Sequence, residues 1–430
     1  MRILFVTAAY LPESIGGVEL HVHALAREYA RLGHEVVVFT RGADATRPEF
    51  AIERYRVDGV AVVRLNYRFS DCVDFAGIVR NASIRAAFDA ELARQSFDVV
   101  HVHHLTCLST DLIDAARARG LPVVMTLHDF WMGCPRGQRM TRELFLCEDV
   151  DVARCATCLP QMWSGWFGLG RDGPNVPEAE RDRRDLEQLA QYHTWMRGLL
   201  GRVERLITPS RHSKLVFERY GIAPERIVVV ENGLDDAPFR GITRTPSRRF
   251  RFGYVGSVLP TKGVHVLIDA FVKLADPATE LHVWGEAGAW HEVTDYGAKL
   301  RAAAAGHERI AFHGRYGAHD LPRILAGLDA LVVPSLWYEA FCLTLREGWL
   351  ARLPVAASCI GALEEAVSDG VDGLLFPAGN ADALRLVLHR LAHEPGLAAR
   401  LADSRPRVRT VHENANDLLR NYADFAGGRR

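Results

Sequence analysis

The sequence of 430 residues contains very little lysine: of its 52 basic residues only four are lysines, and arginine provides the rest. The formal net charge is −1, which excludes a global electrostatic attraction to nucleic acid or anionic lipid. No stretch approaches the roughly 20 apolar residues that a membrane-spanning helix needs. Because lysine is so rare in this chain, each of the four is a candidate site residue: Lys214, Lys262, Lys273 and Lys299.

The sequence also lacks a secretory signal peptide and a dinucleotide fingerprint. Residues 1–7 are too few for a signal-peptide core and predict a first strand. The glycine pair Gly16-Gly17 after this strand does not have the G-x-G-x-x-G spacing, which argues against a dinucleotide cofactor. Scattered cysteines fit a reducing compartment. We therefore expect a cytoplasmic protein, with peripheral contact at the inner face of the membrane left open.

Two arrays of alternating strands and helices are present, as expected for a chain too long for one typical domain. Residues 3–7, 20–32 and 35–40 predict a strand, a helix and a strand, so a parallel sheet with right-handed crossovers follows. The pattern restarts at residue 250 after a segment with two prolines and scattered charge. We predict an α/β protein with two doubly wound, Rossmann-like domains facing a central cleft.

The predicted domain boundaries follow from these two arrays. The first domain covers 1–234 and carries an irregular stretch rich in cysteine and tryptophan at about 130–177. A linker at 235–249 leads to the second domain at 250–405. Residues 406–430 are expected to form a helix that packs back on the first domain.

The most informative stretch is the loop between a buried strand at 330–333 and a helix at 344–353. It carries two acids eight residues apart, Glu339 and Glu347. Unpaired amides at a helix start favour an anion, and a glutamate just inside the helix can accept hydrogen bonds from a polyol. An isolated pair of this kind is more often a solvated acid and a helix-dipole partner.

This pair is not isolated. The run Pro334–Phe341, the second glutamate and Leu353–Ala357 resemble the E-x7-E region of retaining glycosyltransferases of family 4. The resemblance extends over nearly the whole chain. Two positions depart from it, since Ala340 and Cys342 stand where the family usually has glycine.

The resemblance implies a GT-B fold and transfer of a hexose from a nucleoside diphosphate sugar to a hydroxyl acceptor with retention of configuration. It also implies that the first domain, 1–234, binds the acceptor and that the second domain, 250–405, binds the nucleotide sugar. Glu347 would hold the ribose, Lys262 the diphosphate, and Glu339 the sugar as a catalytic residue. No cofactor is expected for catalysis, and the one Asp-x-Asp, at 149–151, lies outside the βα core, which argues against a metal-dependent donor site. The donor-binding set expected from the resemblance is Gly16, Gly17, Gly256, Ser257, Lys262, Ala340, Phe341, Cys342, Leu343, Thr344 and Glu347.

Two histidines complete the expected catalytic set. His103 and His128 each follow a predicted strand, where open α/β sheets bind ligands. A purely structural role is the alternative for both. By the family likeness His103 would contact the transferred sugar or its acceptor.

The loop 256–263 places Lys262 between a strand and a helix, where its charge can neutralise a diphosphate. An ordinary solvated lysine is the alternative. The family commonly has arginine after the first glycine of this loop, and Ser257 stands there instead. A phosphate contact is thus either lost or supplied by another residue.

Half of the eight cysteines fall within 25 residues: Cys134, Cys147, Cys155 and Cys158. Four thiolates can close a tetrahedral zinc site, and the Cys-x-x-Cys spacing of the last two is common in such sites. Independent buried thiols, disulfides and an iron–sulfur cluster are the alternatives. A zinc ion here would be structural and would stabilise the irregular stretch.

Two other functions remain open at this stage. A sugar-nucleotide epimerase of the same fold would consume the donor without an acceptor. A catalytically silent protein would bind a nucleotide sugar or a partner. The expected partners are a nucleotide sugar and an acceptor from a cell-surface polysaccharide, glycolipid or small-glycoside pathway, and not nucleic acid; the sequence leaves the oligomeric state open.

Overall fold

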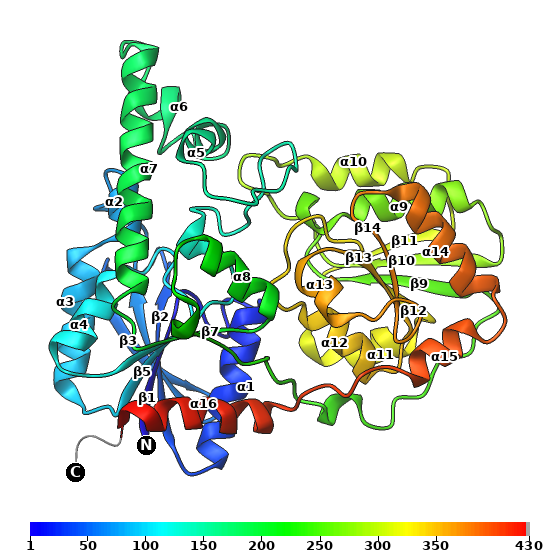
Figure 1. The fold of residues 1–430 in the computed structure, drawn as a ribbon, viewed down its shortest axis with the longest axis horizontal. Coiled ribbons are helices and arrows are strands. Elements are labelled where there is room, and N and C mark those ends of the chain that lie inside the picture. Colours follow the sequence, from blue (N-terminus) through cyan, green and yellow to red (C-terminus); the bar gives the residue numbers. More distant parts are fainter. Residues whose placement is uncertain (427–430) are drawn as a thin grey trace. The chain divides into compact units, whose positions relative to one another are not determined.

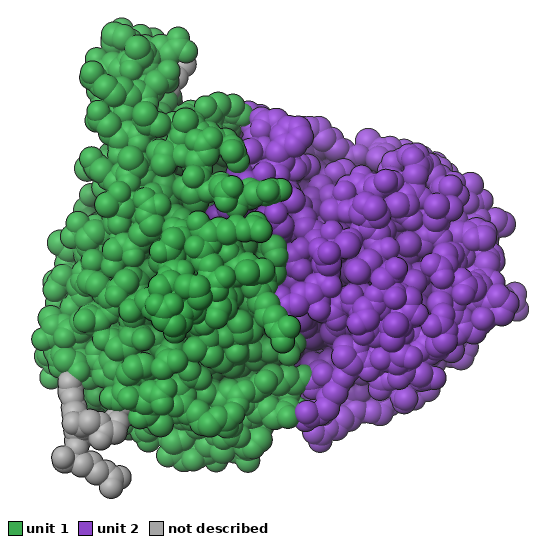
Figure 2. Space-filling model, in the orientation of Figure 1, with its two compact units in different colours: residues 1–137, 148–233, 409–430 green, residues 138–147, 234–408 purple. Residues whose placement is uncertain are grey.

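The computed structural model describes residues 1–426, which form two compact units (Figures 1 and 2). Unit 1 contains residues 1–137, 148–233 and the chain from 409 onwards. Unit 2 contains residues 138–147 and 234–408. Each unit has its own parallel sheet with helices on both faces, which is the doubly wound arrangement that the sequence predicts.

Unit 1 is built on an eight-stranded sheet with the order β3-β4-β2-β1-β5-β6-β7-β8. The pairs are parallel except for β3, which runs antiparallel to β4. The strands are β1 (Arg2–Thr7), β2 (Glu35–Gly42), β3 (Ile52–Val57), β4 (Val60–Asn66), β5 (Val99–Val102), β6 (Val123–Thr126), β7 (Arg205–Thr208) and β8 (Ile227–Val229). The α-helices are α1 (Gly17–Arg31), α2 (Phe75–Val79), α3 (Ala82–Arg94), α4 (Asp111–Ala118), α5 (Val152–Cys158), α6 (Gly168–Asp172), α7 (Glu178–Leu200), α8 (Arg211–Arg219) and α16 (Val411–Ala426). Short 3-10 turns are η1 (Trp131–Gly133), η2 (Leu159–Gln161) and η3 (Pro224–Arg226).

Both faces of this sheet are apolar because helices cover both. On β2, Val36 and Val38 pack in the cluster formed with α1 and α16, whereas Phe39 points to the other face and meets Phe88 of α3, with ring centroids 5.0 Å apart. Strands buried on two faces read as continuous apolar runs, and this is why they are recognisable in the sequence.

Unit 2 is built on a six-stranded, fully parallel sheet with the order β11-β10-β9-β12-β13-β14. The strands are β9 (Phe250–Val255), β10 (Thr279–Trp284), β11 (Ile310–Gly314), β12 (Ala330–Val333), β13 (Val355–Cys359) and β14 (Leu374–Pro377). The α-helices are α9 (Val264–Leu274), α10 (Tyr296–Ala303), α11 (Leu321–Ala326), α12 (Leu343–Leu350), α13 (Gly361–Ala366), α14 (Ala381–His393) and α15 (Leu397–Asp403). Short 3-10 turns are η4 (Ala237–Phe239), η5 (Pro260–Lys262) and η6 (Ala318–Asp320).

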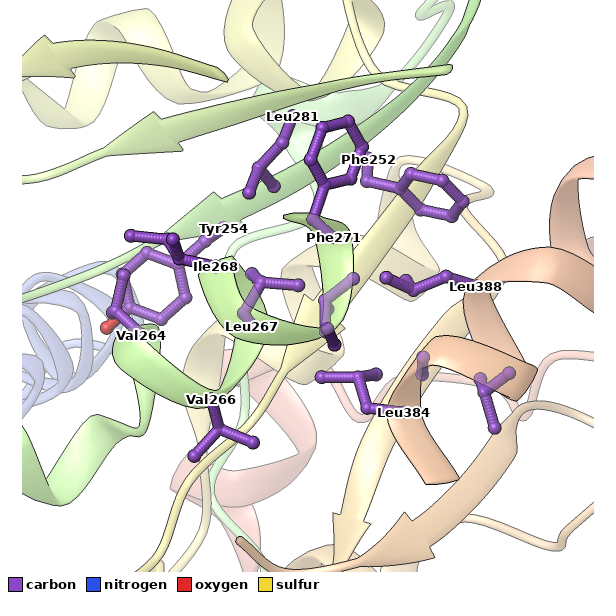
Figure 3. Packing of buried hydrophobic residues seen from close by; sticks show 14 of the residues in the cluster. Phe252, Tyr254, Val264, Val266, Leu267, Ile268, Phe271, Leu281, Leu384 and Leu388 are labelled. Atoms are coloured by element: carbon purple, nitrogen blue, oxygen red, sulfur yellow. The ribbon is translucent and has the colours of Figure 1, made fainter. Parts of the chain in front are cut away.

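Two separate apolar clusters cover the faces of this second sheet. Figure 3 shows one of them, in which Leu267 and Phe271 of α9 meet Phe252 of β9 and Leu388 of α14. The other cluster contains α11, α12 and α13 with the opposite side chains of β12 and β13. The sheet thus holds α12, and with it the loop before α12, in a fixed position.

The helix α16 returns the end of the chain to unit 1. Its buried residues Ala415, Leu418 and Tyr422 lie three and four positions apart, so they form one apolar face. This face packs in the cluster that also contains Tyr29 of α1. The hydroxyl of Tyr422 bonds to His101 Nδ1, and the hydroxyl of Tyr29 donates to Tyr422 at 3.2 Å.

The structure differs from the predicted organisation in three places. Residues 235–249, predicted as a linker, belong to unit 2, where Arg244 donates to the carbonyl oxygens of Leu325 and Leu328 at 2.8 and 2.7 Å. Residues 138–147, predicted within the first domain, also belong to unit 2, because Met140 packs in its core. The stretch predicted as irregular contains the helices α5 and α6. Its short segments have too little periodicity to be recognised as helices in the sequence.

Within the described residues, no helix is both long enough and apolar enough to cross a membrane.

Replacing Tyr422 by phenylalanine should destabilise unit 1, because the hydroxyl partner of the buried His101 is lost. Leaving a buried polar group without a partner costs about 1–3 kcal/mol. Urea denaturation followed by circular dichroism measures this cost. Asn421→Ala is the control, since Asn421 bonds only within its own helix, to the carbonyl of Asp417. Equal midpoints for Tyr422→Phe and the wild type would contradict the role of the hydroxyl.

Candidate active site

The loop between β12 and α12 holds a buried carboxylate. Glu339 is only 5% exposed, and it lies between the buried strand β12 and the start of α12 at Leu343. Its Oε1 accepts three hydrogen bonds: from Ser335 Oγ at 2.6 Å, from Trp337 Nε1 at 2.9 Å and from Lys262 Nζ at 2.8 Å. No described residue donates a hydrogen bond to Oε2. One oxygen is therefore fixed by the protein, and the other is left for a ligand.

The charge of Glu339 is maintained despite its burial. Burial alone raises the pKa of this carboxyl, but the charge and hydrogen bond of Lys262, with the bonds from Ser335 and Trp337, hold the pKa below its usual value. The carboxylate is thus ionised at neutral pH. A buried charge requires such compensation, because desolvation strongly disfavours an unpaired ion.

Lys262 reaches Glu339 from a second loop, at the end of η5 before α9. Its ammonium also lies 4.9 Å from the ring centroid of Trp337. The next residue, Gly263, has a φ of +70°, and a Cβ there would lie 1.9 Å from the carbonyl oxygen of Pro334. Gly263 therefore allows the two loops to approach each other closely enough for the ion pair.

Glu347 lies in α12 and is half-buried. Burial raises the pKa of its carboxyl to about 7. No hydrogen bond or ion pair joins it to a described residue, but its charge contributes to the raised pKa of the nearby Tyr316, after burial. The Glu347 carboxyl has no partner among the described residues, and its helix follows the loop that carries Glu339. It is therefore a candidate for accepting hydrogen bonds from a ligand.

The remaining donor-binding residues predicted from the sequence lie in both units. Gly256 and Ser257 follow β9, and the Ser257 carbonyl accepts a hydrogen bond from Tyr254 at 2.6 Å. In the loop between β12 and α12, Cys342 has a φ of +66°, the left-handed conformation that glycine adopts without cost. The other members of the set in unit 2 are Ala340, Phe341, Leu343 and Thr344. Gly16 and Gly17 begin α1 and belong to unit 1, so the structure does not gather the whole set in one unit.

Unit 1 brings His103 and His128 together after the neighbouring strands β5 and β6. Their facing nitrogens, His103 Nδ1 and His128 Nε2, are 3.0 Å apart. Burial, followed by neighbouring histidines, holds both pKa values well below the ordinary one, so both rings are neutral. The Nε2 of His103 is buried without a hydrogen-bond partner. The pair can therefore donate or accept a hydrogen bond, but it carries no charge.

A third histidine of this cluster was missed by the sequence analysis. His21 of α1 lies with its ring centroid 5.3 Å from that of His128, and burial lowers its pKa to about 4. In the sequence His21 falls within a predicted helix, and nothing in the local pattern indicates that this helix brings it to the edge of the sheet. His104 differs from the cluster, because Asp129 accepts its hydrogen bond at 2.9 Å and raises its pKa against the effect of burial.

The structure gives no support to the predicted zinc site of the four clustered cysteines, and this site stays a prediction. Among residues 1–426, no group of three or more histidine, cysteine or acidic side chains is arranged to hold a metal ion. Cys147 belongs to unit 2, whereas Cys134, Cys155 and Cys158 belong to unit 1. Because the chain changes units between these cysteines, their spacing in the sequence does not place all four in one unit.

Two family models match the chain and together cover both units. The model described as "Glycosyltransferase Family 4" matches residues 15–159, and the model described as "Glycosyl transferases group 1" matches residues 235–407. The second match contains both loops of the Glu339 site.

Curated relatives and solved structures agree with these models. A glycogen synthase of Mycobacterium tuberculosis is 28% identical, with 94% of this chain and 88% of the relative covered. A D-inositol 3-phosphate glycosyltransferase of Frankia alni is 27% identical, with 90% and 88% covered. Among solved structures, Anabaena HepE in complex with UDP and glucose aligns over 98% of this chain and 99% of its own, with a TM-score of 0.67 and 18% identity.

The fold and the paired loops define a GT-B protein with two Rossmann-like domains. The two matched models and the curated relatives identify the chain as a glycosyltransferase similar to family 4, and the family resemblance predicted from the sequence is confirmed.

Cys342 offers a test of the backbone at the start of α12. A left-handed conformation costs a residue with a side chain roughly 1–2 kcal/mol, and glycine avoids this cost but loses about 0.4–1 kcal/mol through its freer unfolded state. We expect Cys342→Gly to be at least as stable as the wild type. Cys342→Val should be less stable, because a branched side chain disfavours this conformation most. Thermal denaturation of the two variants measures the difference, and a valine variant as stable as the glycine variant would refute the strained backbone.

Trp337 should act as a positioning residue for Glu339. Trp337→Phe keeps an aromatic face beside Lys262 but removes the indole donor, so the pKa of Glu339 should rise. The acid limb of the pH profile of kcat/KM should then move to higher pH, and Ser335→Ala should move it in the same direction. Leu336→Met, a volume-conserving change on the same loop, is the control. Loss of activity at every pH without a shift of this limb would point to a purely structural role.

Proposed function

We propose that the protein is a retaining hexosyltransferase that uses a nucleoside diphosphate sugar as its donor and a hydroxyl group as its acceptor. The observation that carries this proposal is the arrangement around Glu339. One oxygen of a buried, ionised carboxylate is held by three donors, and a lysine is paired to it within 2.8 Å. Such a site offers a fixed acceptor for a sugar hydroxyl and a cation for a phosphate.

The candidate site residues of unit 2 each have a role in this reaction. Glu347 accepts hydrogen bonds from the two ribose hydroxyls. Lys262 stabilises the negative charge that grows on the departing diphosphate, since an ammonium acts as a compact point charge. Oε2 of Glu339 accepts a hydrogen bond from a hydroxyl of the hexose and orients it. Amides at the start of α12 contribute donors to the phosphates.

In the transfer step, the acceptor oxygen forms a bond to the anomeric carbon on the face from which the diphosphate leaves. The bond between the anomeric carbon and the phosphate oxygen breaks, and its electron pair stays with the diphosphate. The proton of the acceptor hydroxyl passes to the departing phosphate oxygen. His103 and His128 are neutral in unit 1 and can orient hydroxyl groups of the sugar or acceptor.

The similar proteins suggest which donor to examine first. Anabaena HepE has been solved with UDP-glucose and with UDP and glucose. A mannosyltransferase of Mycolicibacterium hassiacum is 27% identical to this chain. We therefore place UDP-glucose first in a panel that also contains GDP-mannose, ADP-glucose and UDP-N-acetylglucosamine.

Thermal denaturation with each member of this panel tests the proposal. A ligand at a hundred times its Kd adds about 2.7 kcal/mol to the stability, so the correct donor should raise the melting temperature clearly. Slow release of nucleoside diphosphate without an acceptor is then expected, with an α-linked product by NMR once an acceptor is supplied. A C2 isomer of the free sugar would identify an epimerase, and binding without any turnover would identify a silent binding protein.

Glu347 predicts a pH dependence of donor binding. The free carboxyl has a pKa of about 7, and hydrogen bonds from ribose hydroxyls favour its ionised form. Binding of the selected nucleotide sugar should therefore strengthen from pH 6 to pH 8 and then level off, with proton release on the acid side. Glu347→Gln should abolish this pH dependence and weaken binding. Calorimetry in two buffers of different ionisation enthalpy measures the released proton, and binding that is independent of pH in the wild type would contradict the role of Glu347.

A further inference from the structure

Unit 1 contains a cavity of about 320 Å³, and Gly17 of the predicted donor-binding set is one of the residues that line it. It lies where β1, β2 and β5 end and α1 begins. Its lining includes Thr7, Gly17, Glu19, Arg41, His104 and Cys107. Polar groups gathered at the carboxyl ends of parallel strands form the usual ligand position of such a sheet.

Arg41 is the cation of this cavity. Its Nη1 donates to the carbonyl oxygen of Tyr67 at 2.8 Å, and its guanidinium carbon lies 5.0 Å from the ring centroid of Phe69. Its Nε is buried without a hydrogen-bond partner. Among the described residues, no carboxylate forms an ion pair with it. The guanidinium is therefore held in place on one side and left unneutralised on the other.

The acidic groups at the cavity are already engaged. Ser14 Oγ donates to the Glu19 carboxylate at 3.1 Å, and the other oxygen of Glu19 lies against Gly16 at the start of its own helix. There the carboxylate offsets the partial positive charge of the helix end. Asp129, outside the lining, is paired with His104 at 2.9 Å. The charge of Arg41 is the one that remains for a ligand.

A second polar group at the cavity also has no partner. Thr106, which lines the cavity, has a buried hydroxyl without a hydrogen bond. Cys107 lies close enough to Arg41 that the arginine opposes the rise in the pKa of its thiol caused by burial. An arginine with free donors beside an unpaired hydroxyl fits a planar or tetrahedral oxyanion, which a guanidinium can bind with two parallel hydrogen bonds.

We propose that this cavity is the part of the acceptor site that recognises an oxyanion, so that the acceptor is a hydroxyl compound bearing a phosphate monoester or a carboxylate. This rests on the proposed function, since it assigns the substrate class of the same transferase. Arg41 binds the anion and Thr106 donates to one of its oxygens. A neutral acceptor would leave the Arg41 guanidinium without a counter-charge.

Three compounds with the same sugar ring test the proposal: glucose 6-phosphate, glucuronate and glucose. Calorimetry with the full-length protein and saturating UDP should give at least tenfold tighter binding for the phosphate or the carboxylate than for glucose. Whichever of the two is preferred identifies the anion. Arg41→Gln should remove this preference and change the binding of glucose less than twofold, and Arg41→Lys should retain part of it. Arg68→Gln is the matched control, because Arg68 is exposed and lies 3.4 Å from Glu49.

Alkylation of Cys107 gives a second measurement that does not depend on the sugar. Inorganic phosphate should slow its reaction with iodoacetamide in the wild type and in Arg68→Gln, but not in Arg41→Gln, as read by mass spectrometry of the peptide.

Equal affinity for the three compounds in the wild type, together with no protection by phosphate, would overturn the oxyanion site. An anion preference that survives in Arg41→Gln would overturn the role of Arg41. Binding of UDP-glucose separates these outcomes from failure of the proposed function. Arg41→Gln should bind UDP-glucose as the wild type does, whereas a wild type that neither binds nor consumes any nucleotide sugar would refute the transferase itself.

Discussion

In each unit, parallel strands bring their carboxyl ends to one edge of a sheet, and the position of every candidate site residue depends on this constraint. The loop after β12 carries Glu339, and the loop after β9, the neighbouring strand, carries Lys262. Residues 77 positions apart in the chain therefore form an ion pair. In unit 1 the same constraint places His103 and His128 side by side after β5 and β6.

The ion pair of Glu339 and Lys262 prepares the donor loops electrostatically before any ligand arrives. Removing one partner from a buried pair typically costs about 3–5 kcal/mol, because the other charge is left uncompensated. The lysine is the less buried of the two, with a side chain 25% exposed against 7% for the glutamate. A phosphate can therefore reach the ammonium from the solvent side while Ser335 and Trp337 continue to hold the carboxylate. Preorganised charges of this kind need little rearrangement during a reaction.

The two units contribute different chemistry. Unit 2 presents charged groups whose positions are fixed by hydrogen bonds, which suits a diphosphate and a sugar held in one orientation. Unit 1 presents the neutral pair His103 and His128, and at its cavity Arg41, for which no described carboxylate forms an ion pair. Neutral imidazoles can orient hydroxyl groups without attracting a phosphate. On this division we base the proposal that unit 2 recognises the donor and unit 1 the acceptor.

The sequence by itself determined the two strand-and-helix arrays and the class of fold, and it marked Glu339, Glu347 and Lys262 as candidate site residues. These features are local: apolar runs indicate strands, and two glutamates eight positions apart, together with a rare lysine, mark two loops. The tertiary structure alone decided that Trp337 and Lys262 share one oxygen of Glu339, that His21 joins the histidine pair, and that Arg41 faces a cavity. It also assigned the four clustered cysteines to two units, which their spacing in the sequence does not indicate. Contacts between distant segments depend on strand order and crossover, and no local pattern in a single sequence records them.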